Sequence, residues 1–175
     1  MGRVDGKVAL VTGGSLGIGR ACAIMLAREG AKVAVTDIDE AAGGEVVQAI
    51  KAAGGDAIFI RHDVASEEQW RAAIDRTLEA YGKLDILVNN AGVGKTADIE
   101  SQTLDDWRFL MSINLDGVFL GTKLGIEAMK RGGSGGSIVN MSSILGIVGE
   151  ATASSYNASK GGVRLLTKSA ALHCA

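Results

Sequence analysis

Short apolar runs alternate with longer amphipathic stretches along the whole chain, and this alternation limits the possible folds more than any other feature. The apolar runs are rich in β-branched residues and have the length of strands; they occupy residues 7–11, 32–36, 57–61, 84–88 and 137–141. The stretches between them show helical spacing of apolar residues, at 17–29, 40–53, 67–81, 104–131 and from about 152 onward. Such alternation predicts a parallel sheet with helices on both faces. Right-handed crossovers make this a doubly wound α/β architecture, the Rossmann fold, in a single domain over residues 1–175.

The composition argues against several kinds of function. The net charge is −2 without a dense basic run, so we expect no nucleic-acid partner. No apolar run approaches the roughly 20 residues of a membrane helix, and the polar N-terminus leaves no room for a signal peptide. We therefore expect a cytoplasmic protein without membrane contact. Two cysteines and two histidines, Cys22, Cys174, His62 and His173, have no neighbours at metal-ligand spacing, which predicts no metal site.

A glycine-rich turn follows the first predicted strand. Residues 12–19 read TGGSLGIG, a T-G-x-x-x-G-x-G pattern that opens a helix. Glycines in this place allow the backbone to approach a pyrophosphate, which the unpaired N–H groups of the helix N-terminus can bind. We therefore expect this turn to bind a dinucleotide cofactor, through Gly13, Ser15, Leu16, Gly17, Ile18 and Gly19.

Asp37 ends the second predicted strand. A carboxylate in this place can accept hydrogen bonds from the ribose hydroxyls of an adenosine, and it would repel a 2′-phosphate. Its neighbour Ile38 and the turn residue Leu16 offer no basic group to such a phosphate. The sequence therefore predicts NAD in preference to NADP, with Asp37 and Ile38 at the adenosine.

Polar and small residues also follow the third and fourth predicted strands. Asp63 and Val64 come after the third, and the run NNAG at 89–92 comes after the fourth. Ligands of doubly wound sheets bind beyond the carboxyl ends of the strands. We therefore expect further cofactor contacts from Asp63, Val64, Asn90, Ala91 and Gly92.

Tyr156 and Lys160 are four residues apart on the last predicted helix, so their side chains share a face. A tyrosine with an ordinary pKa near 10 is a poor acid–base catalyst at neutral pH, and a nearby ammonium lowers that pKa. The pair indicates a tuned proton donor or acceptor, although the same spacing also occurs on solvated helix faces. Ser143 follows the fifth strand, and Asn114 lies inside a helix, where an amide is disfavoured without a structural or catalytic task.

Together these motifs resemble the short-chain dehydrogenase/reductase family, in its T-G-x-x-x-G-x-G and Y-x-x-x-K branch. The matching pieces are TGGSLGIG at 12–19, Asp37, DV at 63–64, NNAG at 89–92, the N-x-x-G-x-F run at 114–119, Ser143 in NMSS, and YNASK at 156–160. They occur in the family's order and spacing over essentially the whole chain. The glycine spacing disfavours another class on a similar sheet, the sugar-nucleotide epimerases and dehydratases.

The resemblance implies a role for each matched residue. Tyr156 would be the general acid/base on the substrate oxygen, and Lys160 would lower its pKa and hold the nicotinamide ribose. Ser143 would orient the substrate oxygen, and Asn114 would anchor a water in a proton relay. Thr12 would tie the glycine turn to the NNAG segment.

The resemblance also implies an oxidoreductase that transfers a hydride between NAD(H) and a secondary alcohol or ketone. Family members usually form homotetramers through their long helices. Leu145, Val148 and Glu150 follow Ser143 and are expected to line a mostly apolar substrate pocket.

Members of this branch usually have seven strands, whereas about five are predicted here. The sequence ends at Ala175 within a predicted helix, which we interpret as a domain incomplete at its C-terminus. The fifth strand is then expected to form an exposed sheet edge. An alternative function follows from the same interpretation, namely a catalytically silent nucleotide-binding fragment that lacks the substrate segment.

Overall fold

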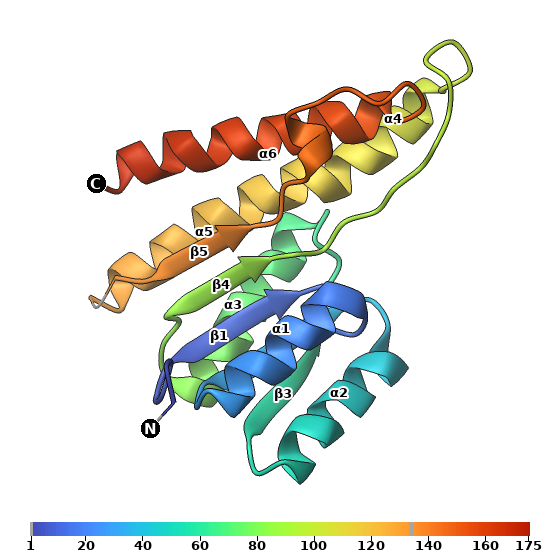
Figure 1. The fold of residues 1–175 in the computed structure, drawn as a ribbon. Coiled ribbons are helices and arrows are strands. Elements are labelled where there is room, and N and C mark those ends of the chain that lie inside the picture. Colours follow the sequence, from blue (N-terminus) through green and yellow to red (C-terminus); the bar gives the residue numbers. More distant parts are fainter. Residues whose placement is uncertain (1, 134) are drawn as a thin grey trace.

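A computed structural model describes residues 2–133 and 135–175. Five parallel strands form one sheet in the order β3-β2-β1-β4-β5 (Figure 1). The strands are β1 (Val8–Thr12), β2 (Lys32–Asp37), β3 (Asp56–Arg61), β4 (Ile86–Asn89) and β5 (Ser137–Asn140). The predicted parallel sheet is confirmed, and each strand end falls within two residues of its predicted position.

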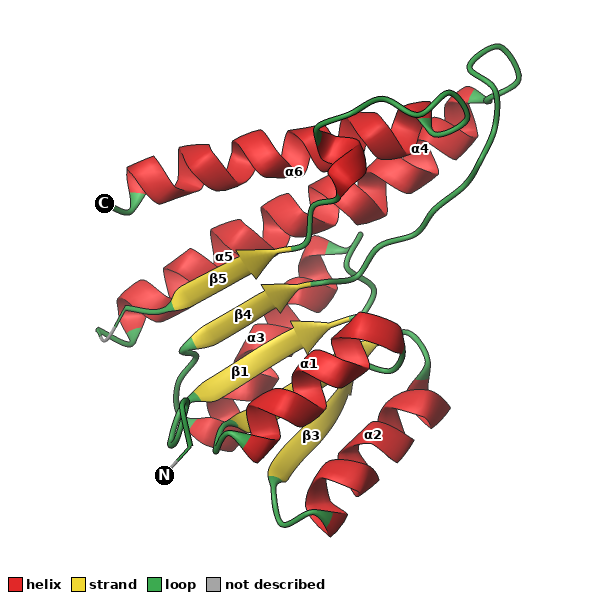
Figure 2. Cartoon of the chain, in the orientation of Figure 1, coloured by secondary structure: helices red, strands yellow, loops and turns green. Residues whose placement is uncertain are grey.

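Helices cover both faces of the sheet, as Figure 2 shows. On one face, α1 (Gly17–Arg28) and α2 (Glu40–Ala52) pack against β1, β2 and β3. On the other face lie α3 (Glu67–Tyr81) and α5 (Gly117–Arg131), with α6 (Ser154–His173) beside α5. The doubly wound Rossmann arrangement predicted from the alternation of elements is therefore confirmed.

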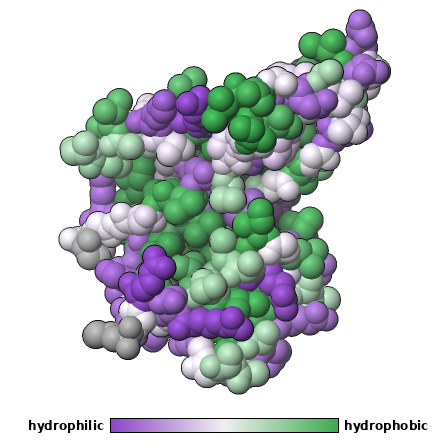
Figure 3. All heavy atoms as spheres, in the orientation of Figure 1, coloured by the Kyte–Doolittle hydropathy of each residue, from purple (hydrophilic) through white to green (hydrophobic). Residues whose placement is uncertain are grey.

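Burial follows the position of each strand in the sheet. All five residues of β1 are buried, because this central strand has a helical layer on both sides. The edge strand β5 instead has Val139 exposed at 47%. Figure 3 shows apolar atoms gathered in the middle of this face, where Figure 1 places β4 and β5. The predicted exposed edge at the fifth strand is confirmed.

One long helical run crosses the back of the sheet. It consists of α4 (Leu104–Met111), a π-helical turn η1 (Ser112–Asp116) and α5. Together they make 28 continuous helical residues with a mean hydropathy of 1.2 over the most apolar window, enough by length and composition to cross a membrane. The expectation concerned uninterrupted apolar runs, and this helix is interrupted by charged residues such as Asp116 and Lys123. The same window is 44% buried, and its apolar residues pack against α3 and β4, which accounts for its composition.

Candidate active site

The register of the sheet brings the predicted site residues to one edge. Thr12 pairs with Thr36, Asp37 with Arg61, and Asn89 with Asn140, so the strands end nearly in line. Two cavities of about 550 Å³ and about 460 Å³ open beyond these ends. Their walls share four residues, Ile18, Asn90, Gly92 and Val93. The two cavities therefore form one elongated cleft. We call the part beside the glycine turn the nucleotide cavity (about 460 Å³) and the part beside Tyr156 the tyrosine cavity (about 550 Å³).

The nucleotide cavity gathers most of the residues predicted to bind the cofactor. Its wall contains Gly13, Leu16, Gly17, Ile18, Asp37, Ile38, Asp63, Val64, Asn90, Ala91 and Gly92. Two predicted contacts, Ser15 and Gly19, are buried behind this wall instead. The Ser15 hydroxyl donates to the Asp39 carbonyl oxygen at 3.3 Å, so it serves the turn itself.

The glycine turn has the geometry that close approach to an anion requires. Gly13 has a φ of +61°, and a Cβ there would lie 2.9 Å from the Cα of Ala91. A Cβ on Gly19 would collide with the carbonyl oxygen of Gly13. Among the described residues no side chain caps the N-terminus of α1, and its first turn has no acidic residue. The first N–H groups of α1 are thus free for an anion, and the turn fits the phosphates of a dinucleotide.

Hydrogen bonds from two side chains fix the turn against the segment after β4. The Thr12 hydroxyl accepts from the backbone N–H groups of Asn90 and Ala91, each at 3.0 Å. The Asn90 amide donates back to the carbonyl oxygens of Thr12 at 2.9 Å and Gly13 at 3.2 Å. The predicted tie between Thr12 and this segment is confirmed. Asn90 makes the same connection and also lines both cavities.

The Asp37 carboxylate lies on the wall of the nucleotide cavity and has partners in the chain itself. One oxygen accepts from the N–H groups of Ile38 at 2.8 Å and Asp39 at 3.3 Å. The other accepts from the Ser15 N–H at 3.1 Å. Its position at the end of β2 is therefore accounted for by the turn that it stabilises, independently of any ribose.

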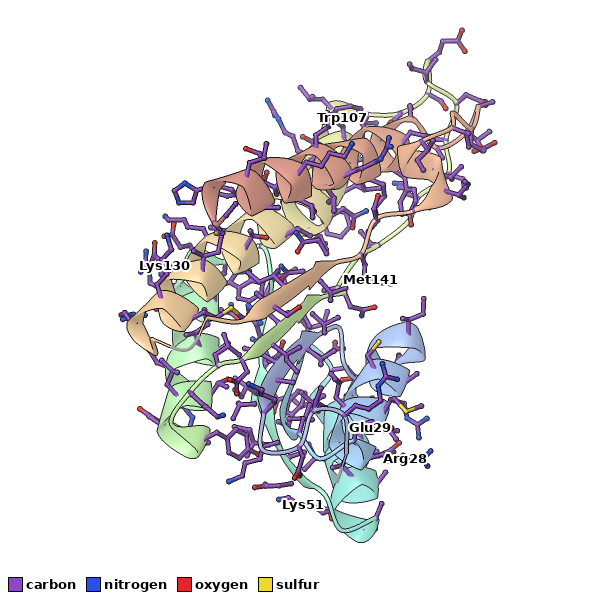
Figure 4. The ribbon with its side chains drawn as sticks, turned by 60° about the vertical axis from the view of Figure 1, so that its left-hand side comes forward. Arg28, Glu29, Lys51, Trp107, Lys130 and Met141 are labelled. Atoms are coloured by element: carbon purple, nitrogen blue, oxygen red, sulfur yellow. The ribbon has the colours of Figure 1, made fainter. Side chains whose placement is uncertain are left out.

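Tyr156 and Lys160 both line the tyrosine cavity. The ammonium nitrogen of Lys160 lies 5.6 Å from the centroid of the Tyr156 ring. Lys160 is 5% exposed, and burial lowers the pKa of its side chain. It donates to the carbonyl oxygen of Met141 at 2.7 Å. Met141 directly follows β5 (Figure 4). The structure thus brings the two residues of the Y-x-x-x-K pair together at one wall.

Asn114 lies in the π-helical turn and is completely buried. Its amide oxygen accepts from the Val93 N–H at 2.8 Å, and its amide nitrogen donates to the Val93 carbonyl at 2.8 Å. A Cβ on Gly92 would lie 3.2 Å from the Asn114 oxygen and 3.5 Å from the Lys160 nitrogen. Gly92, Asn114 and Lys160 therefore converge. The amide that a helix interior disfavours fixes the segment that forms the cavity wall.

Ser143 directly follows Ser142, a residue of the tyrosine cavity wall. Its hydroxyl oxygen accepts from the Leu145 N–H at 3.1 Å, at the start of the short turn η2 (Ile144–Gly146). Within the described part of the chain it shares no hydrogen bond with Tyr156, and it lies outside both cavity walls. Ser142 lines the tyrosine cavity instead. Of the residues expected in the substrate pocket, Leu145 and Glu150 line this cavity and Val148 does not.

Several residues of the site could not be predicted from the sequence motifs. Met141 and Val93 act through backbone atoms, which any residue type supplies. Asn157 donates to the carbonyl oxygens of Leu145 at 2.6 Å and Val148 at 2.7 Å, and so holds the loop that carries the pocket residues. The position of Asn157 within the YNASK motif could have indicated this contribution. Gln102 forms hydrogen bonds with two serines at the start of α6, and no motif in the sequence indicated this.

A sequence profile described as short chain dehydrogenase matches residues 7–175. This chain belongs to the short-chain dehydrogenase family. Its relatives in the family include an NADP-dependent (R)-specific alcohol dehydrogenase of Lentilactobacillus kefiri, 51% identical over 99% of the chain and 68% of that protein. A cyclopentanol dehydrogenase of Comamonas testosteroni is 45% identical over all of the chain and 70% of that protein. A 3-beta-hydroxysteroid dehydrogenase of the same species is 44% identical over 98% of the chain and 66% of that protein.

The comparison with the Lentilactobacillus kefiri protein corrects the predicted cofactor. The preference for NAD rested on Asp37, yet this short-chain dehydrogenase of 51% identity is named as NADP-dependent. The prediction of NAD over NADP is therefore wrong on this comparison. The prediction assumed that Asp37 is present to bind a ribose. The hydrogen bonds from Ser15 and Ile38 show that this carboxylate also stabilises the turn, which requires no ribose.

Proposed function

We propose that this short-chain dehydrogenase transfers a hydride between NADP(H) and a secondary alcohol or ketone, with Tyr156 as the general acid/base. One observation carries the proposal: Tyr156 and Lys160 line a cavity that continues directly into the cavity of the glycine turn. The names of the relatives support the reaction class, since they include dehydrogenases of an alcohol, of cyclopentanol and of a hydroxysteroid.

Each wall of the cleft has a separate task in this proposal. The first N–H groups of α1 hold the cofactor phosphates, and Asp63 and Val64 lie beside the adenosine. The bound nicotinamide supplies or accepts the hydride. Tyr156 gives its phenol proton to the carbonyl oxygen during reduction and takes it back during oxidation. The Lys160 ammonium lies 5.6 Å from the centroid of the Tyr156 ring and would attract negative charge that develops there during proton transfer.

Two further residues complete the proposed proton chemistry. Asn114 positions the segment beside Lys160 and anchors a water of the relay. Ser143 orients the substrate oxygen through its hydroxyl proton, which the hydrogen bond accepted from Leu145 leaves free to donate.

We propose NADP as the cofactor because the Lentilactobacillus kefiri relative carries that name. The 2′-phosphate would then lie near Asp37, whose carboxylate is held in place by the N–H groups of Ser15 and Ile38. The choice between the two nicotinamide cofactors is open to a direct measurement, the ratio of kcat/KM for NADP and NAD.

We also propose that the protein forms a homotetramer and is located in the cytoplasm. Leu104, Phe109 and Phe119 are exposed apolar residues on α4 and α5, which supports pairing of copies through these helices into a tetramer. Cys22 and Cys174 are free thiols, which supports the reducing interior of a cell.

The test uses the two tyrosines of the chain. Parent, Tyr156→Phe and Tyr81→Phe are assayed with a panel of secondary alcohols and ketones, with NADP(H) and NAD(H). We expect Tyr156→Phe to lose about 10²- to 10⁴-fold in kcat while Tyr81→Phe, on the outer helix α3, stays at the parent value. Cofactor binding is measured separately by fluorescence titration. Binding without turnover in the parent would favour the silent nucleotide-binding module, and full activity of Tyr156→Phe would disprove the assigned proton donor.

A further inference from the structure

The helix that carries Tyr156 starts without a cap of its own. α6 begins at Ser154, and Tyr156 lies in its first turn. Within residues 2–133 and 135–175, the N-cap residue Ala153 offers no side-chain hydrogen bond to this turn. Uncapped first turns fray, because their N–H groups have no partner inside the helix. A phenol that must meet a substrate atom therefore needs another support.

That support comes from Gln102, a residue outside the helix. Its carboxamide nitrogen donates to the Ser155 hydroxyl at 2.7 Å, and its carboxamide oxygen accepts from the Ser154 hydroxyl at 3.0 Å. Ser155 is completely buried, directly beside Tyr156 in the chain. One side chain thus holds two consecutive residues of the first turn by both ends of its amide.

The segment that carries Gln102 is attached to the same helix start at a second place. The Ala97 N–H donates to the Thr152 carbonyl oxygen at 2.9 Å, and Ala97 forms a parallel bridge with Ala153. Figure 1 shows this segment, between β4 and α4, running beside the loop before α6. Its earlier residues Val93 to Thr96 line the tyrosine cavity. The segment is therefore both a wall of the cavity and the clamp on the helix.

We propose that Gln102 is a positioning residue, whose carboxamide fixes the first turn of α6 and so holds the Tyr156 phenol in place beside Lys160. The inference rests on the proposed function of Tyr156. It adds that Gln102 keeps the phenol of Tyr156 at a fixed position relative to Lys160. Gln102 does not line the cavity, so it acts through the helix and not by contact with the substrate.

The charged groups on the wall of the tyrosine cavity are Lys95, Glu150 and Lys160. Gln102→Met leaves all three in place, keeps the length of the side chain and removes both hydrogen bonds. A change in the titration of Tyr156 in this variant would therefore report a changed distance to Lys160, since no charge has been added or removed.

The chain offers a direct optical readout of that titration. Only two tyrosines are present, and burial together with Asp56 raises the pKa of Tyr81 well above its ordinary value. In a Tyr81→Phe background Tyr156 is the one tyrosine left, so the phenolate absorbance that appears as pH rises is its own. This measurement requires no substrate and no turnover.

We expect Gln102→Met to lower kcat about ten- to a hundredfold, since small misplacements of a reacting group cost that much, with the KM for cofactor unchanged. The Tyr156 titration and the pH profile of alcohol oxidation should both move to higher pH. Ser155→Ala removes one of the two hydrogen bonds and should give smaller shifts in the same direction, and the double variant should shift no more than Gln102→Met alone. The matched control is Gln48→Met, at an exposed position of α2.

The outcomes separate this inference from the function on which it rests. An active Tyr156→Phe overturns the proposed function. If that variant is inactive while Gln102→Met and Ser155→Ala titrate and turn over like Gln48→Met, only the role of Gln102 is overturned. Should Gln102→Met fail to fold by circular dichroism, the titration of Ser155→Ala alone decides between the two results.

Discussion

The ammonium of Lys160 lies 2.7 Å from the carbonyl oxygen of Met141, the residue that follows the edge strand β5. This contact fixes a buried cation at the junction of the sheet and α6, where it also faces the Tyr156 ring. Burial lowers the pKa of Lys160, which means that the fold disfavours its charged form relative to water. The site therefore holds this charge at a cost in stability.

Replacement of Lys160 should change the free energy of unfolding and the activity in opposite directions. We expect Lys160→Met to lose at least about 10²-fold in kcat and to raise the free energy of unfolding at pH 7 by about 1 kcal/mol. In the parent, the unfolded chain binds the proton more tightly, so stability should increase as pH rises toward the ordinary lysine value of 10.5. Urea unfolding between neutral and alkaline pH measures this increase, which the variant should lack. Lys168→Met, at an exposed position of the same helix, is the control, and equal pH dependence in both variants would contradict the argument.

The charge of Asp37 should oppose the 2′-phosphate of NADP. Asp37→Asn removes the charge and keeps the oxygen that accepts from Ile38 and Asp39, while the bond from Ser15 is lost. We expect NADP to bind about tenfold more tightly, on the order of the Coulomb energy between partly solvated charges at this range. Isothermal titration with NADP measures the gain. Asp39→Asn keeps a good N-cap for α2 and should change NADP binding less; an unchanged affinity in Asp37→Asn would place the phosphate elsewhere.

The sequence was sufficient for the sheet and for most of the cleft, because both depend on local patterns. Strand composition and helical spacing are local, and motifs such as the glycine turn and Asp37 are placed by the strands that they follow. The amide of Gln102 depends instead on a contact between segments far apart in the chain, whereas the Ser143 hydroxyl accepts from the N–H of Leu145, two residues further on. The π-helical turn that contains Asn114 was not predicted either, and its amide pairs with Val93 in another segment.

Two adjacent glycines in α2 should respond to alanine in opposite directions. A Cβ on Gly43 would collide with the ring of Phe59, whereas a Cβ on Gly44 has nothing within 4 Å. Alanine stabilises an exposed helix position by up to about 1 kcal/mol relative to glycine. We therefore expect Gly44→Ala to raise the free energy of unfolding by up to about 1 kcal/mol, and Gly43→Ala to lower it by about 1–3 kcal/mol through overpacking. Thermal and urea unfolding of the pair provide the comparison, and each variant is the control for the other. Stabilisation by both would show that Phe59 moves aside freely.

Acid should destabilise the fold through His62. This ring is buried under the nucleotide cavity, with its Nδ1 3.1 Å from the Thr36 hydroxyl and its centroid 4.4 Å from that of Trp70. Burial lowers the pKa of His62 from 6.5 to about 4, so between these values the unfolded chain binds a proton that the folded chain does not. Stability should fall as pH decreases from 6.5 to about 4, by roughly 3 kcal/mol in total, and this contribution should not change further at lower pH.

His62→Gln should remove that component, because its amide can still bond Thr36 but does not titrate. Urea unfolding from pH 7.5 to 4 is compared for the parent, His62→Gln and His173→Gln; His173 is the only other histidine and is exposed at the end of α6. The carboxylates that also titrate in this range are common to all three proteins, so the difference between the curves isolates the histidine. His62→Gln should lose less stability on acidification than the other two. Parallel curves for all three would mean that His62 takes up its proton equally in the folded and unfolded chain, and would contradict its burial as the cause.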